Sequence, residues 1–135
     1  MIYNRQKKEL AALTLDADGN TDPLNVEAYK TITLSIGSDA AADLTLKVKG
    51  TTESQQTTDV DFTASQGLDN RWDYILCKDR EDDAGLDGDT GIVISGGADA
   101  RQLEVNANAL DFICLEVSGY SAGSIKVVVS GYSNA

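Results

Sequence analysis

Apolar and polar residues alternate in several short segments of the chain. Within Thr31–Ile36 the apolar side chains lie at positions 32, 34 and 36, and within Leu44–Lys49 they lie at positions 44, 46 and 48. A period of two is typical of a β-strand that buries one face. Because residues 37–43 between them are small or polar, the pattern predicts that these two strands form a β-hairpin.

Turn-bounded segments of the same kind occur along the rest of the chain. Glycine-rich turns such as Gly96-Gly97 and residues 119–123 separate them, since glycine adopts positive φ angles without strain. About eight strands at this spacing predict an all-β fold, a single-domain β-sandwich of the jelly-roll-like type. Beyond the predicted hairpin, we expect strands at residues 10–15, 72–78, 92–95, 102–106, 112–118 and 124–130, and a short or edge strand at residues 60–63.

The chain is 135 residues long, which fits one domain. We predict an N-terminal arm at residues 1–10 and the β-sandwich domain at residues 11–135. The arm overlaps the one candidate for a helix, residues 5–12, which contains several good helix formers, although a helix this short is marginal by itself. A β-sandwich also has edge strands, and oligomerisation or an exchanged arm would cover them.

The sequence contains no histidine. A Ser-His-Asp triad, a Cys-His pair and a histidine-ligated catalytic zinc are therefore excluded. Glycoside hydrolysis needs two carboxyl groups that face each other in a cleft, whereas strand alternation points Asp73 and Glu104 at solvent. We predict that the protein is not an enzyme.

Twenty-two acidic and eleven basic residues give the chain a formal net charge of −11. Such a surface repels the phosphates of nucleic acids and anionic membranes, so we expect neither as a partner. The N-terminus has no apolar signal segment, and no run of residues is apolar enough to span a membrane. These features predict a protein that is made in a cytoplasm and stays there unless an assembly carries it out.

The cysteines and some aromatic residues of the predicted strands are most simply interpreted as structural. Cys77 and Cys114 both lie within strands and lack a CxxC spacing, so we expect buried free thiols and no disulfide. Trp72 and Tyr74 share a predicted strand face with Leu76, which favours core packing over a sugar-stacking platform.

Two loops carry clustered acidic residues. In the first, side-chain oxygens occur at alternate positions, at Asp16, Asp18, Asn20 and Asp22, as they do in calcium-binding loops. The segment departs from the EF-hand pattern, since glycine comes fourth and no bidentate glutamate follows. We expect a turn here, with calcium as the one candidate cofactor. The second loop, residues 79–91, is either held open by charge repulsion or gathers a hard cation.

A few side chains are candidates for contacts with a partner protein. Arg5, Lys7 and Lys8 form a local basic cluster in an acidic chain. They either dock an acidic neighbour or belong to a frayed terminus. Tyr120 lies in a predicted turn, and we expect its ring to be exposed and available for binding.

The second half of the chain has a familiar arrangement of strand and turn segments. It runs from Asn70-Arg71-Trp72-Asp73-Tyr74 through residues 87–92 and 104–110 to residues 117–125. This half resembles small virion structural proteins of tailed bacteriophages, the β-sandwich subunits encoded near the capsid genes. The resemblance implies a capsid decoration, cement or minor head protein, which forms a homo-oligomer and binds a capsid. It carries over no catalytic residues.

We therefore expect a non-enzymatic phage virion protein, assembled in the host cytoplasm, that binds the major capsid protein or other virion proteins and stabilises the capsid exterior. A homotrimer is the expected oligomer, and the arm at residues 1–10 is the expected attachment element. One alternative is a carbohydrate- or receptor-binding module of a virion fibre, with Tyr120 and the acidic loops at its tip. Another is a tail or neck connector, which would share the fold.

Overall fold

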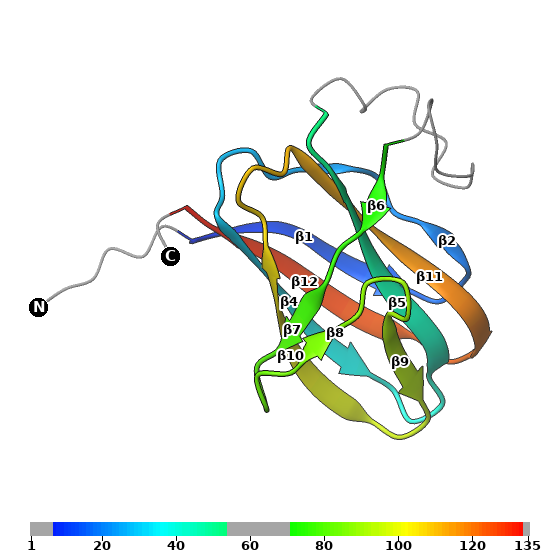
Figure 1. Cartoon of the computed structure of the whole chain (residues 1–135). Helices are drawn as coiled ribbons and strands as arrows, with labels where there is room; N and C mark the ends of the chain where they lie inside the picture. Colours follow the sequence, from blue (N-terminus) through cyan, green and yellow to red (C-terminus); the bar gives the residue numbers. More distant parts are fainter. Residues whose placement is uncertain (1–6, 54–70, 134–135) are drawn as a thin grey trace, which may run out of the picture.

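The computed structural model describes residues 7–53 and 71–133. These residues form β-strands and no helix, which confirms the predicted all-β, single-domain β-sandwich (Figure 1). No helix long and apolar enough to cross a membrane occurs in the two described ranges. The strands are β1 (Lys7–Leu15), β2 (Gly19–Asn20), β3 (Leu24–Asn25), β4 (Thr31–Ser38), β5 (Asp43–Thr51), β6 (Asp73–Tyr74), β7 (Cys77–Asp79), β8 (Gly85–Leu86), β9 (Ile92–Ser95), β10 (Asp99–Asn106), β11 (Phe112–Ala122) and β12 (Ile125–Tyr132).

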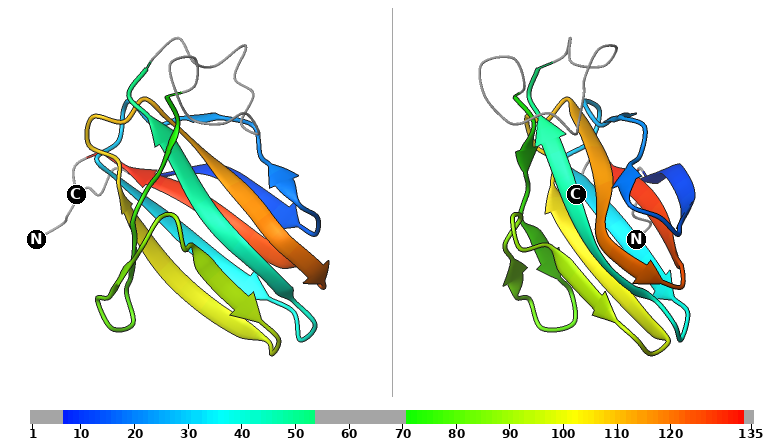
Figure 2. Two further views of the ribbon diagram at one scale, coloured as in Figure 1. Left: turned by 45° about the vertical axis from the view of Figure 1, so that its right-hand side comes forward. Right: turned by 90° about the vertical axis from the view of Figure 1, so that its right-hand side faces the viewer.

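The strands form two antiparallel sheets that lie face to face (Figure 2). The first sheet has the order β1-β12-β4-β10-β7-β8, and the second has the order β2-β11-β5-β6, with β3 also paired to β11 and β9 to β5. Without β6, β7 and β8, the sheets reduce to β1-β12-β4-β10 facing β2/β3-β11-β5-β9. Two interlocked Greek keys give this order, so the topology is that of a jelly roll with β6–β8 inserted between β5 and β9.

The core lies between the two sheets and consists mainly of aliphatic side chains. Alternate residues of β4 and β10, including Leu34 and Leu103, face alternate residues of β5 and β11, including Leu46 and Leu115, and all four leucines have no exposed surface. Burying each side chain of this size contributes about 1.5–3 kcal/mol. The period of two in the sequence is therefore the direct source of the sandwich.

The hairpin predicted from residues 31–49 is wrong. β4 pairs with β10 and β12 in the first sheet, whereas β5 pairs with β11, β6 and β9 in the second. The segment between them crosses from one sheet to the other, and Asp39 fixes it by accepting hydrogen bonds from the backbone N–H and hydroxyl of Ser124, at 3.1 and 3.3 Å. Two strands with one buried face have the same alternation in a hairpin and in such a crossing, so periodicity does not distinguish them.

The single strand predicted at residues 72–78 is two short strands in different sheets. β6 pairs with β5 and β7 pairs with β10, so the chain crosses the open side of the sandwich between them. Leu76 lies at this crossing and is 55% exposed, which contradicts the shared strand face with Trp72 that we expected. Trp72 itself is buried with Phe112 and Cys114 in a small cluster on the outer face of the second sheet.

The helix candidate at residues 5–12 is not helical where the structure describes it, and the strand predicted at residues 10–15 is confirmed. Residues 7–15 form β1, which pairs along its length with β12. β1 thus includes residues 7–10 of the predicted arm, and Arg5 and the rest of the arm lie outside the described residues. The strand predicted at residues 60–63 lies outside them too. Because β12 presents a long partner edge, tertiary pairing overrides the local helix propensity of this segment.

The two cysteines are free and buried, as predicted. Burial raises the pKa of the Cys77 thiol to about 12, and it does the same for Cys114. A thiol with so high a pKa is a poor nucleophile at neutral pH. Both residues act as small apolar groups.

Candidate functional site

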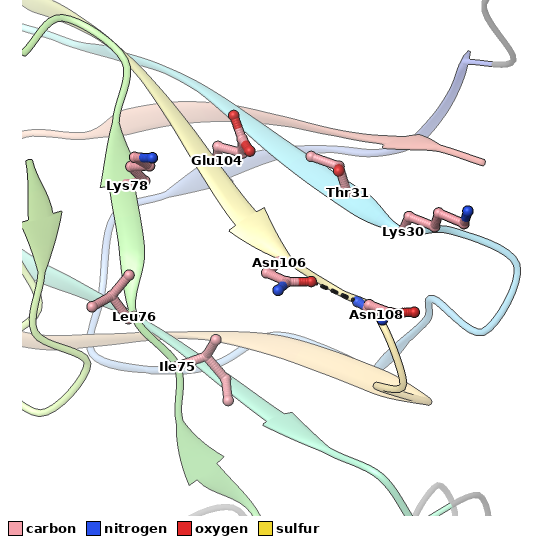
Figure 3. A pocket seen from close by; sticks show the side chains of 8 residues that line it. All are labelled: Lys30, Thr31, Ile75, Leu76, Lys78, Glu104, Asn106 and Asn108. Atoms are coloured by element: carbon pink, nitrogen blue, oxygen red, sulfur yellow. Dashed lines mark hydrogen bonds between the residues drawn. The ribbon is translucent and has the colours of Figure 1, made fainter. Parts of the chain in front are cut away.

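A shallow pocket of about 560 Å³ lies on the outer face of the first sheet (Figure 3). Leu103 and Val105 of β10 point into the core, so the alternate residues Glu104 and Asn106 point outward. Pairing of β10 with β4 places Thr31 opposite Asn106. The lining residues are Lys30, Thr31, Ile75, Leu76, Lys78, Glu104, Asn106 and Asn108.

The pocket is polar on one side and apolar on the other. Figure 3 shows Ile75 and Leu76, from the segment between β6 and β7, on one side, and the side chains of β4 and β10 on the other. The amide oxygen of Asn106 accepts a hydrogen bond from the backbone N–H of Asn108 at 3.0 Å. This lining offers amide groups, ammonium groups and an exposed leucine. It suits the binding of a partner loop or a polar ligand by hydrogen bonds and apolar contact.

Ion pairs flank this pocket. Lys78 contacts the Asp83 carboxylate at 3.0 Å, and Glu104 contacts the Arg80 guanidinium at 3.1 Å. Such exposed pairs contribute little to stability. Their effect is to hold the charged side chains at the rim in defined positions.

A second cluster lies on the outer face of the second sheet. The Glu116 carboxylate of β11 contacts the Lys49 ammonium of β5 at 2.9 Å and accepts a hydrogen bond from the Tyr74 hydroxyl of β6 at 2.8 Å. The ammonium groups of Lys47 and Lys49 lie 4.8 and 5.4 Å from the centre of the Tyr74 ring, within the range of a cation–π contact. One carboxylate therefore joins three neighbouring strands.

This cluster predicts an unusual tyrosine titration. Burial and the hydrogen bond to Glu116 raise the pKa of Tyr74 from its ordinary value of 10.0 to about 12. Because the folded-state pKa is raised, the stabilisation from this group is complete below pH 10 and is lost as the pH rises through 12. In a titration of phenolate absorbance, we expect one of the five tyrosines to ionise last.

The Tyr74→Phe variant should lack that last ionisation, and Glu116→Gln should shift it to lower pH. Tyr29→Phe is the matched control, because it removes a tyrosine outside the cluster and should leave the last ionisation in place. A wild-type protein without a late tyrosine ionisation near pH 12 would contradict the burial of Tyr74 and its hydrogen bond to Glu116.

The loop predicted as a turn or calcium site acts as a structural link. The Asp18 carboxylate accepts a hydrogen bond from the backbone N–H of Tyr120 at 2.9 Å, which joins the loop to β11. Asn20 lies in β2 opposite Glu116, while Asp16 and Asp22 are exposed. No group of three or more His, Cys, Asp or Glu side chains suited to a metal ion occurs within residues 7–53 and 71–133. Calcium binding by this loop stays a prediction.

Several carboxylates of the second acidic loop accept local hydrogen bonds or form ion pairs. Asp79 accepts a hydrogen bond from the backbone N–H of Glu81 and contacts the Arg101 guanidinium at 3.1 Å, and these contacts hold its pKa below the usual range. Asp87 accepts hydrogen bonds from the backbone N–H and the hydroxyl of Thr90. The loop is therefore ordered by local hydrogen bonds and ion pairs.

The predicted partner-binding residues do not converge on one site. Lys7 and Lys8 are exposed at the start of β1, and Arg5 lies outside the described residues. Tyr120 lies in β11, half-buried against the core, and its hydroxyl donates a hydrogen bond to the carbonyl of Gly123 at 2.8 Å. The Tyr120 ring is therefore less exposed than expected, and its contact with a partner stays a prediction. The length of β1 separates the lysines from the Asp18–Tyr120 end by roughly 25–30 Å.

Sequence reasoning missed both the pocket and the Lys49–Glu116–Tyr74 cluster. Alternation does place Lys49 and Glu116 on the outward faces of their strands. It does not say that β5 and β11 are neighbours, because the pairing of distant strands is set by the topology. The pocket also depends on the crossing of the chain at Leu76, where the sequence pattern predicted a regular strand.

Comparisons with known proteins support the fold. No family model matches the chain. A search of curated proteins finds no match either. Among solved structures, the crystal structure of SPBc2 prophage-derived protein YomS is similar to this chain, with a TM-score of 0.65, 98% of each chain covered and 10% sequence identity. The structural neighbour is thus a prophage protein with the same fold over its whole length.

Proposed function

We propose that this chain is a non-enzymatic structural protein of a phage virion, a decoration, cement or minor head protein on the capsid exterior. The observation that carries the proposal is the full-length similarity to a prophage-derived protein. The jelly-roll topology agrees with it, because jelly rolls occur in viral capsid and lectin domains. Because a fold alone does not determine function, the charges on the surface are a second, separate line of support.

The charge distribution supports an outward-facing subunit with a basic attachment point. The chain as a whole has a net charge of −11, while Lys7 and Lys8 are exposed at the start of β1, next to residues 1–6. A basic segment on an acidic subunit steers it onto an acidic patch of a neighbour. The interface then exists only in the assembled shell, so binding stabilises that shell by mass action.

The proposal is tested with capsids of the encoding phage that lack this chain. We expect the purified full-length protein to bind these capsids, and a variant without residues 1–6 to lose binding while its circular dichroism is unchanged, because the described sheet begins at Lys7. Lys7→Glu should weaken binding. Lys126→Glu is the matched control, because it reverses an exposed charge on the neighbouring strand.

The possible results distinguish the attachment element from the capsid role itself. Unchanged binding by the truncated variant would remove residues 1–6 as the attachment element. If the full-length protein fails to bind capsids, or binds equally to an unrelated acidic particle, the capsid role itself is overturned. Binding to purified tails or necks alone would favour the connector.

The pocket favours one second candidate, a glycan- or receptor-binding module of a virion fibre. Its volume of about 560 Å³ lies in the range of small-ligand sites, and Asn106 and Asn108 supply hydrogen-bonding amides. Because Tyr120 is half-buried, we place the binding site of this candidate at the pocket, and not at the Tyr120 tip expected from the sequence. A glycan array with and without calcium tests this candidate. Specific binding that Asn106→Ala abolishes would support it, and an array without signal would remove it.

A further inference from the structure

Among the described residues, β1 is the longest strand at an edge of either sheet. β1 has nine residues, and of the described residues only β12 pairs with it. The opposite edge of the first sheet is β8, with two residues, and the edges of the second sheet are divided among β2, β3, β6 and β9, with two to four residues each. Short edge strands are a common protection against further pairing. β1 lacks that protection.

The exposed edge of β1 is protected at its start and open at its end. Lys7, Lys8 and Glu9 are charged, and a β-bulge follows between Glu9 and Ala11, which are features that discourage pairing. The next five residues, Ala11–Leu15, are uncharged and contain no proline. Their backbone N–H and C=O groups on the side away from β12 form a template for another strand.

Apolar side chains on this edge are incompletely covered. Leu13 and Leu15 pack against the core but are only half-buried, and Ala12 and Thr14 are exposed on the outer face. Leucines in the middle of the sandwich have no exposed surface. A strand added beside β1 would therefore bury further apolar area on the inner side of the sheet.

The charges along β1 have opposite signs at its two ends. Lys7 and Lys8 lie at the start, and Asp16 and Asp18 follow the end. In an antiparallel pair of identical strands, the start of each strand lies beside the end of the other. If Ala12 lies at the two-fold axis, Ala11 of each copy faces Leu13 of the other, so inward residues face inward residues next to the axis. The basic start of each β1 then lies beside the acidic residues that follow the end of the other, with the bulge between Glu9 and Ala11 setting their relative position.

We propose that a second copy of this chain occupies the β1 edge, so that two first sheets join through antiparallel β1 strands around a two-fold axis. This pairing supplies backbone hydrogen bonds, covers Leu13 and Leu15, and places opposite charges side by side. The interface favours a second copy of the chain because the charges along β1 are self-complementary around a two-fold axis. The inference goes beyond the capsid role, since it concerns the purified protein in solution.

Sedimentation velocity and light scattering of the purified full-length chain test the proposal. We expect a particle of twice the 14.3 kDa mass of one chain. Ala12→Lys places two like charges near the axis and should weaken the dimer roughly tenfold or more. Val93→Lys is the matched control, because it adds the same charge at a 58% exposed position of the short edge strand β9 and should leave the dimer intact.

A charge-swap experiment tests the register and the partner together. Lys8→Glu alone and Asp16→Lys alone each create two repulsive pairs across the axis, so each variant should dimerise more weakly than the wild type. An equal mixture of the two variants should form a heterodimer, because both cross-axis pairs are then attractive. Circular dichroism of each variant reports whether the fold is retained.

Three results would overturn the proposal. The first is a wild-type chain that remains a monomer at the concentrations used for the variants. The second is a particle of three times the chain mass, which the resemblance to phage proteins predicts. The third is a dimer that Ala12→Lys and Lys8→Glu leave unchanged. Each of these results leaves capsid binding by the chain open, because that is measured separately on capsids.

Discussion

Replacement of Leu115 by alanine is expected to lower the free energy of unfolding by about 2–5 kcal/mol. Leu115 has no exposed surface and lies in the centre of β11, opposite Val48 of β5. The substitution removes apolar contacts and leaves a cavity between the sheets. The surrounding strands are fixed by their hydrogen bonds to neighbouring strands, so they close this cavity only in part. Urea denaturation followed by circular dichroism measures the loss.

Leu76→Ala is the matched control for this prediction. It is the same chemical change at a side chain that is 55% exposed, so we expect the free energy of unfolding to change by less than about 1 kcal/mol. Equal losses at Leu115 and Leu76 would contradict the placement of β11 in the centre of the sandwich.

Replacement of Gly123 by alanine is expected to lower the free energy of unfolding by about 2–5 kcal/mol. One part of the loss comes from placing a non-glycine residue in a left-handed backbone conformation, and the other from steric overlap of the new Cβ atom with its neighbours. Gly123 has a φ angle of +75°, and a Cβ atom there would overlap the backbone of Ala42 and the carboxylate of Asp39. Ala42 has no exposed surface and belongs to the segment that crosses between β4 and β5. Urea denaturation again measures the effect.

Gly119→Ala separates the two contributions. Gly119 also has a positive φ angle, of +60°, but no atom lies within 4 Å of a Cβ built there. The variant should therefore lose only the backbone cost, about 1–2 kcal/mol. If Gly123→Ala lowers the free energy of unfolding no more than Gly119→Ala does, that result would contradict the tight contact between the Gly123 turn and the crossing segment.

Much of the fold could be predicted from local patterns in the sequence. The alternation of Ile32, Leu34 and Ile36 predicts a strand with one buried face, and the structure places all three in the core. The strand segments from residue 92 onward occur close to their predicted positions. The two cysteines were also predicted correctly, since a small apolar side chain inside a strand is best buried.

The pairing of the strands could not be predicted in the same way. Residues 31–49 carry two well-formed strand patterns that belong to different sheets, and nothing local indicates the crossing at residues 39–42. The segment around Leu76 has a strand-like composition but turns from one sheet to the other. In both places, long-range packing decides between arrangements that are locally equivalent.

The candidate site was even less accessible to sequence reasoning. Glu104 and Asn106 could be placed on an outward strand face, yet the pocket also needs Thr31 from β4 and Leu76 from the crossing segment. Tyr120 looked like an exposed turn residue because glycines surround it. In the structure its hydroxyl closes the turn by a hydrogen bond to Gly123, so the ring packs inward.

Quantitative mass spectrometry of purified virions, combined with electron microscopy of antibody-labelled particles, tests the proposed function most directly. We expect the chain to co-purify with intact particles in many copies per virion, and the label to lie on the outside of the head. A chain that accumulates in infected cells but is absent from purified particles would contradict a role in the virion.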